Sequence, residues 1–302
     1  RPVWACGGLF CDNANGGPLP VAQTGENVLF AVDEDPETGQ SNLEAHIQIF
    51  YAGPADRFSW VLPIDSVPTK IDVGANGVFS KLQATTMPQF RIEWREEGQC
   101  RSRGGEDEGG DDGVAESDGA GGSGGASGGV RGVNIAFQAE VGPFDAKVIA
   151  SEDADALKAW LRDNDYFIPD QGGTLIDQYV AERKVFVALK LLSGRDVGEI
   201  QPIVLHFKGP SPCVPLKLTA IAATPDLRVN LWVLGRARVV PDNFLELTVN
   251  QAKIDWSGLG SNYEALLKQA ANEAGGNAFT TEYAGPANIM AGQFWAMTNT
   301  LD

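Results

Sequence analysis

The chain has 302 residues, of which 43% are hydrophobic, and it carries 23 Lys and Arg against 40 Asp and Glu, a formal net charge of −17. This length fits two domains or one large β-rich domain, and the hydrophobic content is high enough to form a core. The negative charge excludes nucleic acid and anionic lipid surfaces as expected partners, and no apolar stretch approaches the ~18 residues that a membrane span needs. Solvation of the surface is the simplest use of the charge, although divalent cations and basic partners also suit it.

The start of the chain is the main evidence for its location. It opens with Arg1-Pro-Val-Trp-Ala-Cys6 rather than with an initiator Met. A removed signal peptide explains such a start, and it would place the protein outside the cytoplasm, secreted or held at the cell surface or in the periplasm. Cysteines in these oxidising compartments form disulfides.

The four cysteines allow three pairings. We predict Cys6–Cys11, because Gly7-Gly8 lets the chain bend between them, and this leaves Cys100–Cys213. A metal site is the alternative, but one pair separated by four residues and two distant single cysteines do not match a zinc ribbon.

Strands with alternating apolar residues are predicted on both sides of residue 100, and the two sides resemble each other. When the sequence is shifted by 156 residues, residues 26–73 align with 182–229 without a gap, and Gly53-Pro54 aligns with Gly209-Pro210. Both segments predict an antiparallel meander, so we expect an internal duplication with the same strand order. The alternative is two unrelated meanders that share only their alternation.

A Gly-rich acidic segment separates these strands. Residues 104–129 contain long runs of Gly, Ser, Asp and Glu, which cannot bury enough apolar surface to become ordered. We predict a disordered loop at 98–132, between an N-terminal β-rich lobe at 1–97 and a C-terminal α+β lobe at 133–302.

Helices are few, so the predicted fold class is α+β with β dominant, in two lobes of antiparallel sheet. The clearest helix spans 151–164, with Ser151 as its N-cap, acidic residues in its first turn and an apolar face of Leu157, Trp160 and Leu161. Three further helical segments are predicted, at 78–83, at 170–180 and at 263–274, the last ending at Gly275-Gly276.

Several segments together resemble a known family. They are Cys6–Cys11, Gln23–Glu26 with Leu29–Ala31, Ile47–Gly53, Phe58–Pro63, Val141–Asp145, Ala156–Leu161, Pro215–Ile221 and Val233–Gly235. In combination they resemble the secreted bacterial family catalogued as a domain of unknown function, DUF2330. The resemblance covers nearly the whole chain apart from the 98–132 loop. It implies secretion but supplies no activity, and therefore no site residue.

Catalytic chemistry has little support in the sequence. His46 and His206 are the two histidines of the chain, and His206 lies within a predicted strand between apolar neighbours, which is typical of a packed histidine. No Gly-x-Ser-x-Gly nucleophile turn and no Gly-rich nucleotide-binding motif is present. The sequence therefore predicts no catalytic residue and no organic cofactor.

Calcium is the one ligand with a candidate site. Asp33, Asp35 and Glu37 place carboxylates on alternate residues before Gly39, as calcium-binding loops do. The segment contains Pro36 and lacks the later Glu of an EF-hand, so a plain acidic hairpin connection is the alternative.

These observations favour a non-catalytic extracellular or cell-surface module for binding or structure, with protein partners or self-assembly through sheet edges. The alternative is a secreted hydrolase with paired carboxylates. For that alternative, Asp255-Trp256 and Glu93-Trp94 each place an acid beside an aromatic ring that suits sugar stacking.

Overall fold

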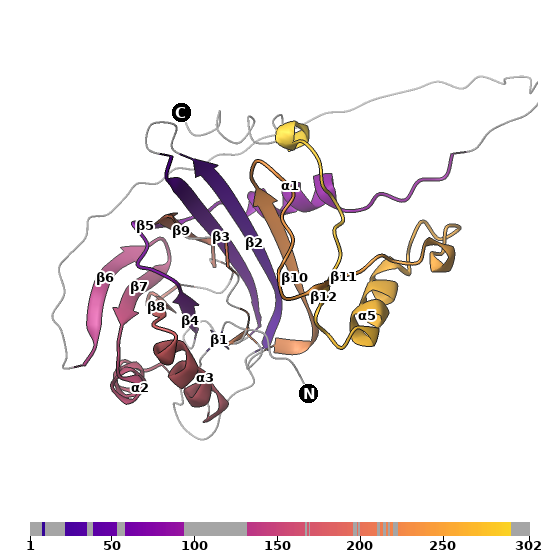
Figure 1. Ribbon diagram of the computed structural model, residues 1–302. Helices are drawn as coiled ribbons and strands as arrows, with labels where there is room; N and C mark the ends of the chain where they lie inside the picture. The colour runs from indigo at the N-terminus through magenta and orange to yellow at the C-terminus, as the bar shows by residue number, and fades with distance from the viewer. Residues whose placement is uncertain are drawn as a thin grey trace, which may run out of the picture. The chain divides into compact units, whose positions relative to one another are not determined.

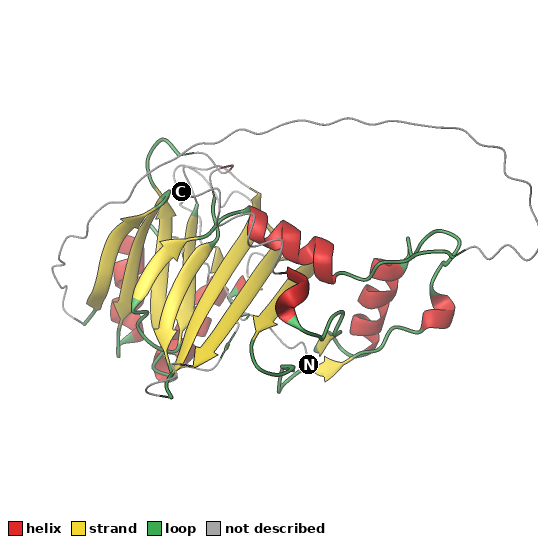
Figure 2. Ribbon diagram, turned by 90° about the horizontal axis from the view of Figure 1, so that it is seen from above, coloured by secondary structure: helices red, strands yellow, loops and turns green. Residues whose placement is uncertain are grey.

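The computed structural model describes the chain in ranges separated by gaps: 8–9, 22–34, 39–52, 58–93, 132–166, 168, 170–195, 198, 200–209, 212–213, 216, 218–219 and 223–290. Strands dominate it (Figure 2), which confirms the predicted β-dominant α+β class. The chain forms two compact units, one from 1–81 and 122–241 and the other from 82–121 and 242–302. Residues 94–131, which hold most of the predicted acidic loop, lie outside the described residues.

The first unit contains two five-stranded sheets (Figure 1). The first sheet is antiparallel, and its strand order is β1 (Gly8–Leu9), β4 (Ser59–Ile64), β8 (Val185–Leu191), β7 (Phe144–Ala150) and β6 (Asn134–Val141). The second sheet has the order β10 (Ala223–Leu234), β2 (Ala22–Glu34), β3 (Ser41–Ala52), β9 (Ile203–Lys208) and β5 (Lys70–Val73).

One pair of the second sheet is parallel, although the sequence predicts only antiparallel strands. β10 runs parallel to β2, from Ala223 opposite Gln23 to Leu234 opposite Ala31. The other pairs of this sheet are antiparallel, so β9 and β10 point the same way. The connection between them must therefore cross from one end of the sheet to the other, which local alternation does not reveal.

The main core lies between the two sheets. The second sheet contributes apolar side chains such as Phe30 and Ile47, and the first sheet contributes Trp60, Leu62 and Val187. In β3 the buried residues alternate with more exposed ones, as expected for a strand with one buried face. In β4 all six residues are buried, because this strand has packed residues on both faces.

Two helices cover the outer face of the first sheet. They are α2 (Ala154–Asp163) and α3 (Asp170–Ala181), both at predicted positions. A second apolar cluster joins them to the sheet, in which Leu157, Trp160 and Leu161 of α2 are buried with Phe186 of β8. The predicted apolar face of α2 is confirmed.

The N-cap of α2 differs from the prediction. Asp153, rather than Ser151, caps the helix, because its side chain accepts hydrogen bonds from the backbone N–H groups of Asp155 and Ala156. The Ser151 hydroxyl donates instead to the backbone oxygens of Gly132 and Asp153. The carboxylate also lies at the positive end of the helix dipole, which favours it over a neutral hydroxyl.

The remaining elements confirm two more predicted helices. α1 (Gly77–Thr86) extends the predicted turn at 78–83. The second unit holds α5 (Tyr263–Glu273), which ends at Gly275 and Gly276 with φ of 77° and 85°. Its other elements are the short parallel pair β11 (Leu245–Glu246) and β12 (Ala278–Phe279), with the 3-10 turns η3 (Gln251–Lys253) and η4 (Ala287–Met290). Within the described ranges, none of the helices has the length and apolar character to cross a membrane.

The predicted duplication is wrong. β2 and β3 are neighbours in the second sheet, whereas β8 and β9, the strands that the shift of 156 residues aligns with them, lie in different sheets. The shared pattern reflects the common two-residue period of strands rather than a repeated unit. The sheets also do not follow the expected division at 98–132, because β4 pairs with β8 and β3 pairs with β9 across it.

The cap of α2 gives the first testable prediction. Replacement of Asp153 by Ala removes both cap hydrogen bonds and should lower the free energy of unfolding by about 1 kcal/mol. Urea denaturation measures this change. Asp163→Ala, at the other end of the helix, is the matched control and should be neutral or slightly stabilising, because a carboxylate there opposes the dipole. Equal losses in the two variants would contradict the assignment of Asp153 as the cap.

Candidate functional site

The outer face of the second sheet holds both histidines of the chain, with acidic and basic side chains beside them. Leu43, Ala45 and Ile47 of β3 point into the core. The intervening residues Glu44 and His46 therefore point to the opposite face. The pairing register then places side chains of β9 and β5 beside them. We call the resulting group of five residues, Glu44, His46, Lys70, Asp72 and His206, the histidine–carboxylate network.

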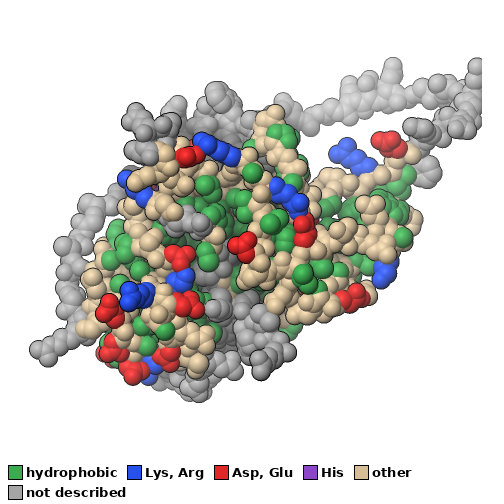
Figure 3. Space-filling view, viewed as in Figure 1, with side chains coloured by type: hydrophobic (Ala, Val, Ile, Leu, Met, Phe, Trp, Pro, Cys, Tyr) green, Lys and Arg blue, Asp and Glu red, His purple; other side chains and the backbone are tan. Residues whose placement is uncertain are grey.

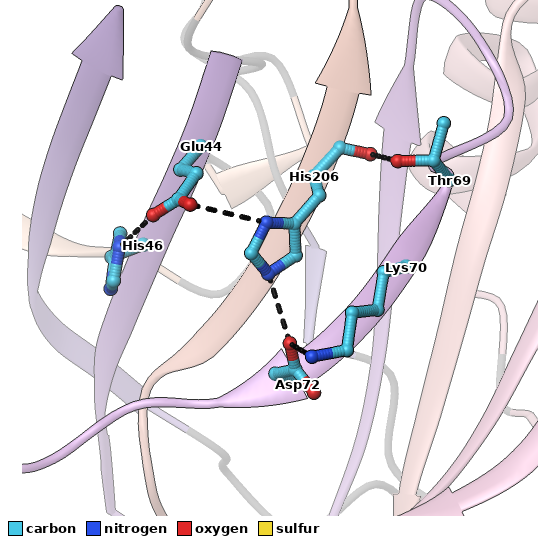
Figure 4. A network of polar contacts seen from close by, with 6 residues as sticks. All are labelled: Glu44, His46, Thr69, Lys70, Asp72 and His206. Carbon is cyan, nitrogen blue, oxygen red and sulfur yellow. Dashed lines mark hydrogen bonds and ion pairs between the residues drawn. The ribbon is translucent and has the colours of Figure 1, made fainter. Parts of the chain in front are cut away.

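The network is centred on His206 (Figure 4). Its Nδ1 lies 3.4 Å from Oε1 of Glu44, and its Nε2 lies 2.9 Å from Oδ2 of Asp72. Oε2 of Glu44 also lies 3.5 Å from Nε2 of His46. Oδ2 of Asp72 forms an ion pair with Nζ of Lys70 at 2.7 Å. Each carboxylate thus bridges two basic groups, and the chain of contacts crosses three strands.

Strand register explains why these residues meet. Glu44, His206 and Lys70 are direct cross-strand partners in one row of β3, β9 and β5. Directly paired side chains on one face lie about 5 Å apart, close enough for ion pairs. Thr69 fixes the end of β5 in this row, since its N–H and its hydroxyl both donate to the backbone oxygen of His206, at 2.7 and 3.1 Å.

The network is partly exposed, and its members differ in electrostatic environment. Of the side-chain surface, 67% is exposed in Lys70, 48% in Glu44 and 25% in His206. Burial lowers the pKa of His46 from its usual 6.5, and the adjacent Glu44 only partly opposes that effect. Neutral His46 is thus favoured in the fold, so its contribution to stability is present above pH 6.5 and is lost as pH falls through the lowered pKa.

A hydrogen-bonded row of one arginine and three amide side chains extends the polar face across β10, β2 and β3. Nε of Arg228 donates to Oδ1 of Asn230 at 2.8 Å, and Nδ2 of Asn230 donates to Oδ1 of Asn27 at 2.8 Å. Nδ2 of Asn27 then donates to Oε1 of Gln48 at 2.9 Å. The row joins β10, β2 and β3, and beside it Phe50 of β3 exposes 43% of its surface.

On β2 and β10, part of the outer face of the second sheet is apolar and is covered by α1. Leu29 of β2 is buried, and Trp232 of β10 packs against Phe79 of α1 with ring centroids 5.8 Å apart. The face thus combines an apolar part next to α1 with a charged part on β3, β9 and β5. Across the side of the protein shown in Figure 3, acidic and basic side chains are interspersed rather than gathered by sign.

The geometry of the network does not favour the chemistry of paired carboxylates. A glycosidase holds its two acids on opposite sides of an open space that the sugar bond enters. Here the ring of His206 lies between Glu44 and Asp72, and each ring nitrogen contacts one of the two carboxylates (Figure 4). Among the described residues, no group of three or more His, Cys, Asp or Glu is arranged to hold a metal ion.

The predicted calcium ligands are only partly described. Asp33 lies exposed near the end of β2, and its Oδ1 accepts the N–H of Glu34 at 2.9 Å. Asp35 and Glu37 lie outside the described residues, so calcium binding by this segment stays a prediction. The same holds for the disulfides, because Cys6, Cys11 and Cys100 lie outside the described residues; Cys213 is described and exposed.

The acid–aromatic pairs suggested for a hydrolase are not brought together as a site. Asp255 accepts hydrogen bonds from the Ser257 hydroxyl, the Gly258 N–H and the Ser261 hydroxyl, and these bonds lower its pKa. The carboxylate therefore stabilises its own turn and stays ionised. Of the second pair, Glu93 is exposed and Trp94 lies outside the described residues.

The sequence analysis missed the role of the histidines. The expectation of a packed His206 fails because its neighbours Leu205 and Phe207 point into the core, whereas His206 itself points to the other face. A usable signal was present in the alternation of Glu44-x-His46 and Lys70-x-Asp72 within strands. Only the register, which brings β3, β9 and β5 together, shows that these pairs face one another.

Comparison with known proteins identifies the family. A sequence profile described as "Uncharacterized protein conserved in bacteria (DUF2330)" matches residues 20–293. The chain belongs to the DUF2330 family. No curated protein and no solved structure matched it. The DUF2330 match spans every strand of the second sheet, and therefore the whole network.

A double-mutant cycle tests the energetics of the network. His206→Ala, Asp72→Ala and the double variant should show a coupling free energy of about 0.5 kcal/mol, because the pair is short but partly solvated. Urea denaturation at low ionic strength measures it, and added salt should reduce it. The control pair is His206 and Asp163, an exposed residue of α2 on the other sheet, and no coupling is expected there. Zero coupling between His206 and Asp72 would contradict the geometry.

Proposed function

We propose that this DUF2330 protein is a secreted, non-catalytic binding module, and that the outer face of the second sheet binds a partner protein. The observation that carries the proposal is the histidine–carboxylate network. His206 directs both ring nitrogens to carboxylates instead of to a hydroxyl or thiol nucleophile. A histidine held in this way orders a charged surface, which suits recognition better than activation of a nucleophile.

The composition of the face supports recognition of a protein. It offers the cation of Lys70 and the carboxylates of Glu44 and Asp72, each at least one-third exposed. Phe50, a large apolar side chain, is exposed on the same face. Interfaces typically combine an aromatic anchor with a polar surround that sets orientation and specificity. The network also fixes its own side chains, so less conformational entropy is lost on binding.

Location outside the cytoplasm is part of the same proposal. The family resemblance implies secretion, and two disulfides from the four cysteines would suit an oxidising compartment. The high acidic content is compatible with solubility there. A partner in the cell envelope or on the surface would then meet this face directly.

Site-specific photo-crosslinking in a producing bacterium tests the proposal. A photoreactive residue in place of Lys70 should yield one discrete adduct, whereas the same residue in place of Arg162, exposed on α2, should not. Adducts at Arg162 but not at Lys70 would contradict the assignment of the face.

The purified partner then allows a quantitative test. Phe50→Ala should weaken binding about tenfold, as expected for the loss of an aromatic anchor. Asp163→Ala, an exposed change on α2, is the matched control and should leave the Kd unchanged. An unaltered Kd for Phe50→Ala, or conversion of the partner into a cleaved product, would overturn the proposal.

A further inference from the structure

A second polar site lies inside the molecule, away from the outer face. Glu26 of β2 is only 3% exposed, and it shares the inner face of its strand with the core residues Val28 and Phe30. Its cross-strand partners are Ile49 of β3 and Val229 of β10, both apolar. A carboxyl group in these surroundings requires specific partners, because burial of a charge without them is costly.

Two uncharged side chains supply the contacts of Glu26. Nε2 of Gln23 donates to Oε2 of Glu26 at 3.2 Å, and the hydroxyl of Thr219 donates to the same oxygen at 3.3 Å. The contact joins two of the segments that carry the family resemblance, which lie 193 residues apart in the chain. All three residues are buried.

Thr219 links Glu26 to another part of the first unit. Its neighbour Leu218 is fully buried in the cluster formed by α2, α3 and the first sheet. Residues 218–219 are thus held on one side by the helix-covered core and on the other by Glu26 of the second sheet. They also lie just before Ala223, where β10 begins its parallel pairing opposite Gln23. The Glu26 contact therefore joins Thr219 to the end of the second sheet at which β10 begins.

The protonation state of Glu26 affects how well this contact holds. Gln23 and Thr219 both donate to Oε2, and a carboxylate accepts these bonds as well, so the cost of ionisation comes from burying the charge among apolar residues. Among the described residues, no charged side chain from β2, β3, β10 or the Thr219 segment contributes to the ionisation of Glu26. Burial dominates, and it raises the pKa of Glu26 from 4.5 to about 7 against the weaker opposing effect of the hydrogen bonds from Gln23 and Thr219.

We propose that Glu26 is a pH-sensitive latch: the neutral carboxyl packs between β2 and Thr219 with no charge to hydrate, whereas the buried carboxylate favours an opened, hydrated start of β10. Because the folded pKa exceeds the unfolded one, the latch stabilises the fold fully below pH 4.5. That stabilisation is lost as pH rises through about 7. The ionised carboxylate would draw water to the end of the second sheet and loosen the start of β10.

Amide hydrogen exchange of the full chain tests the latch. Between pH 6 and pH 8, and after correction for the intrinsic rates, protection of Leu218, Thr219 and Ala223 should fall about tenfold in the wild type. Glu26→Gln keeps a neutral side chain, so its protection should not change with pH and its Tm at pH 8 should rise, by on the order of 5 °C. Glu140→Gln, exposed on β6, is the matched control and should behave as the wild type.

Two results would overturn the proposal. One is equal protection of Leu218, Thr219 and Ala223 at pH 6 and pH 8 in the wild type, a measurement that needs no variant. The other is a carboxyl ¹³C titration of Glu26 with a midpoint near 4.5, which would show that burial does not keep the group neutral. If Glu26→Gln fails to fold, these two wild-type measurements still decide the question.

Discussion

Cross-strand register in the second sheet is the constraint on which both polar sites depend. A strand sends alternate side chains to opposite faces, so the residues that build the core between the sheets determine which residues appear outside. In β3, Leu43, Ala45 and Ile47 enter the core, and Glu44 and His46 must then face outward. A shift of one residue would bury the charges and expose the core. The core-facing residues of β3 thus fix the register that brings the residues of the network together.

The two polar sites each contain a glutamate carboxyl, and the two groups differ in their exposure to water. Glu44 is half exposed and contacts two histidines, so it is open to water and also has polar partners. Glu26 lies among apolar side chains with only an amide and a hydroxyl as donors, and burial raises its pKa to about 7. One carboxyl therefore lies at the surface among polar groups, while burial favours the neutral form of the other, which joins two segments of the interior.

Local features of the fold were predictable, and long-range pairing was not. The apolar face of α2, the glycine end of α5 and the strand alternation all follow from short sequence patterns. The parallel pairing of β10 with β2 and the separation of β8 from β9 into different sheets depend on crossovers that leave no local signal. The same limit hid the network, because Glu44, His206 and Lys70 become neighbours only through pairing of distant strands.

Histidine footprinting tests the central claim, that the outer face of the second sheet is the binding surface. His46 and His206 are the two histidines of the chain and both belong to the network, so their modification by diethyl pyrocarbonate, assigned to each histidine by peptide mass spectrometry, reports on this face. The rates of modification should be compared between the purified protein and the protein in its native bacterial setting. The account predicts modification of His206 in the purified protein and strong protection in the native setting. Equal rates of modification in both would contradict it.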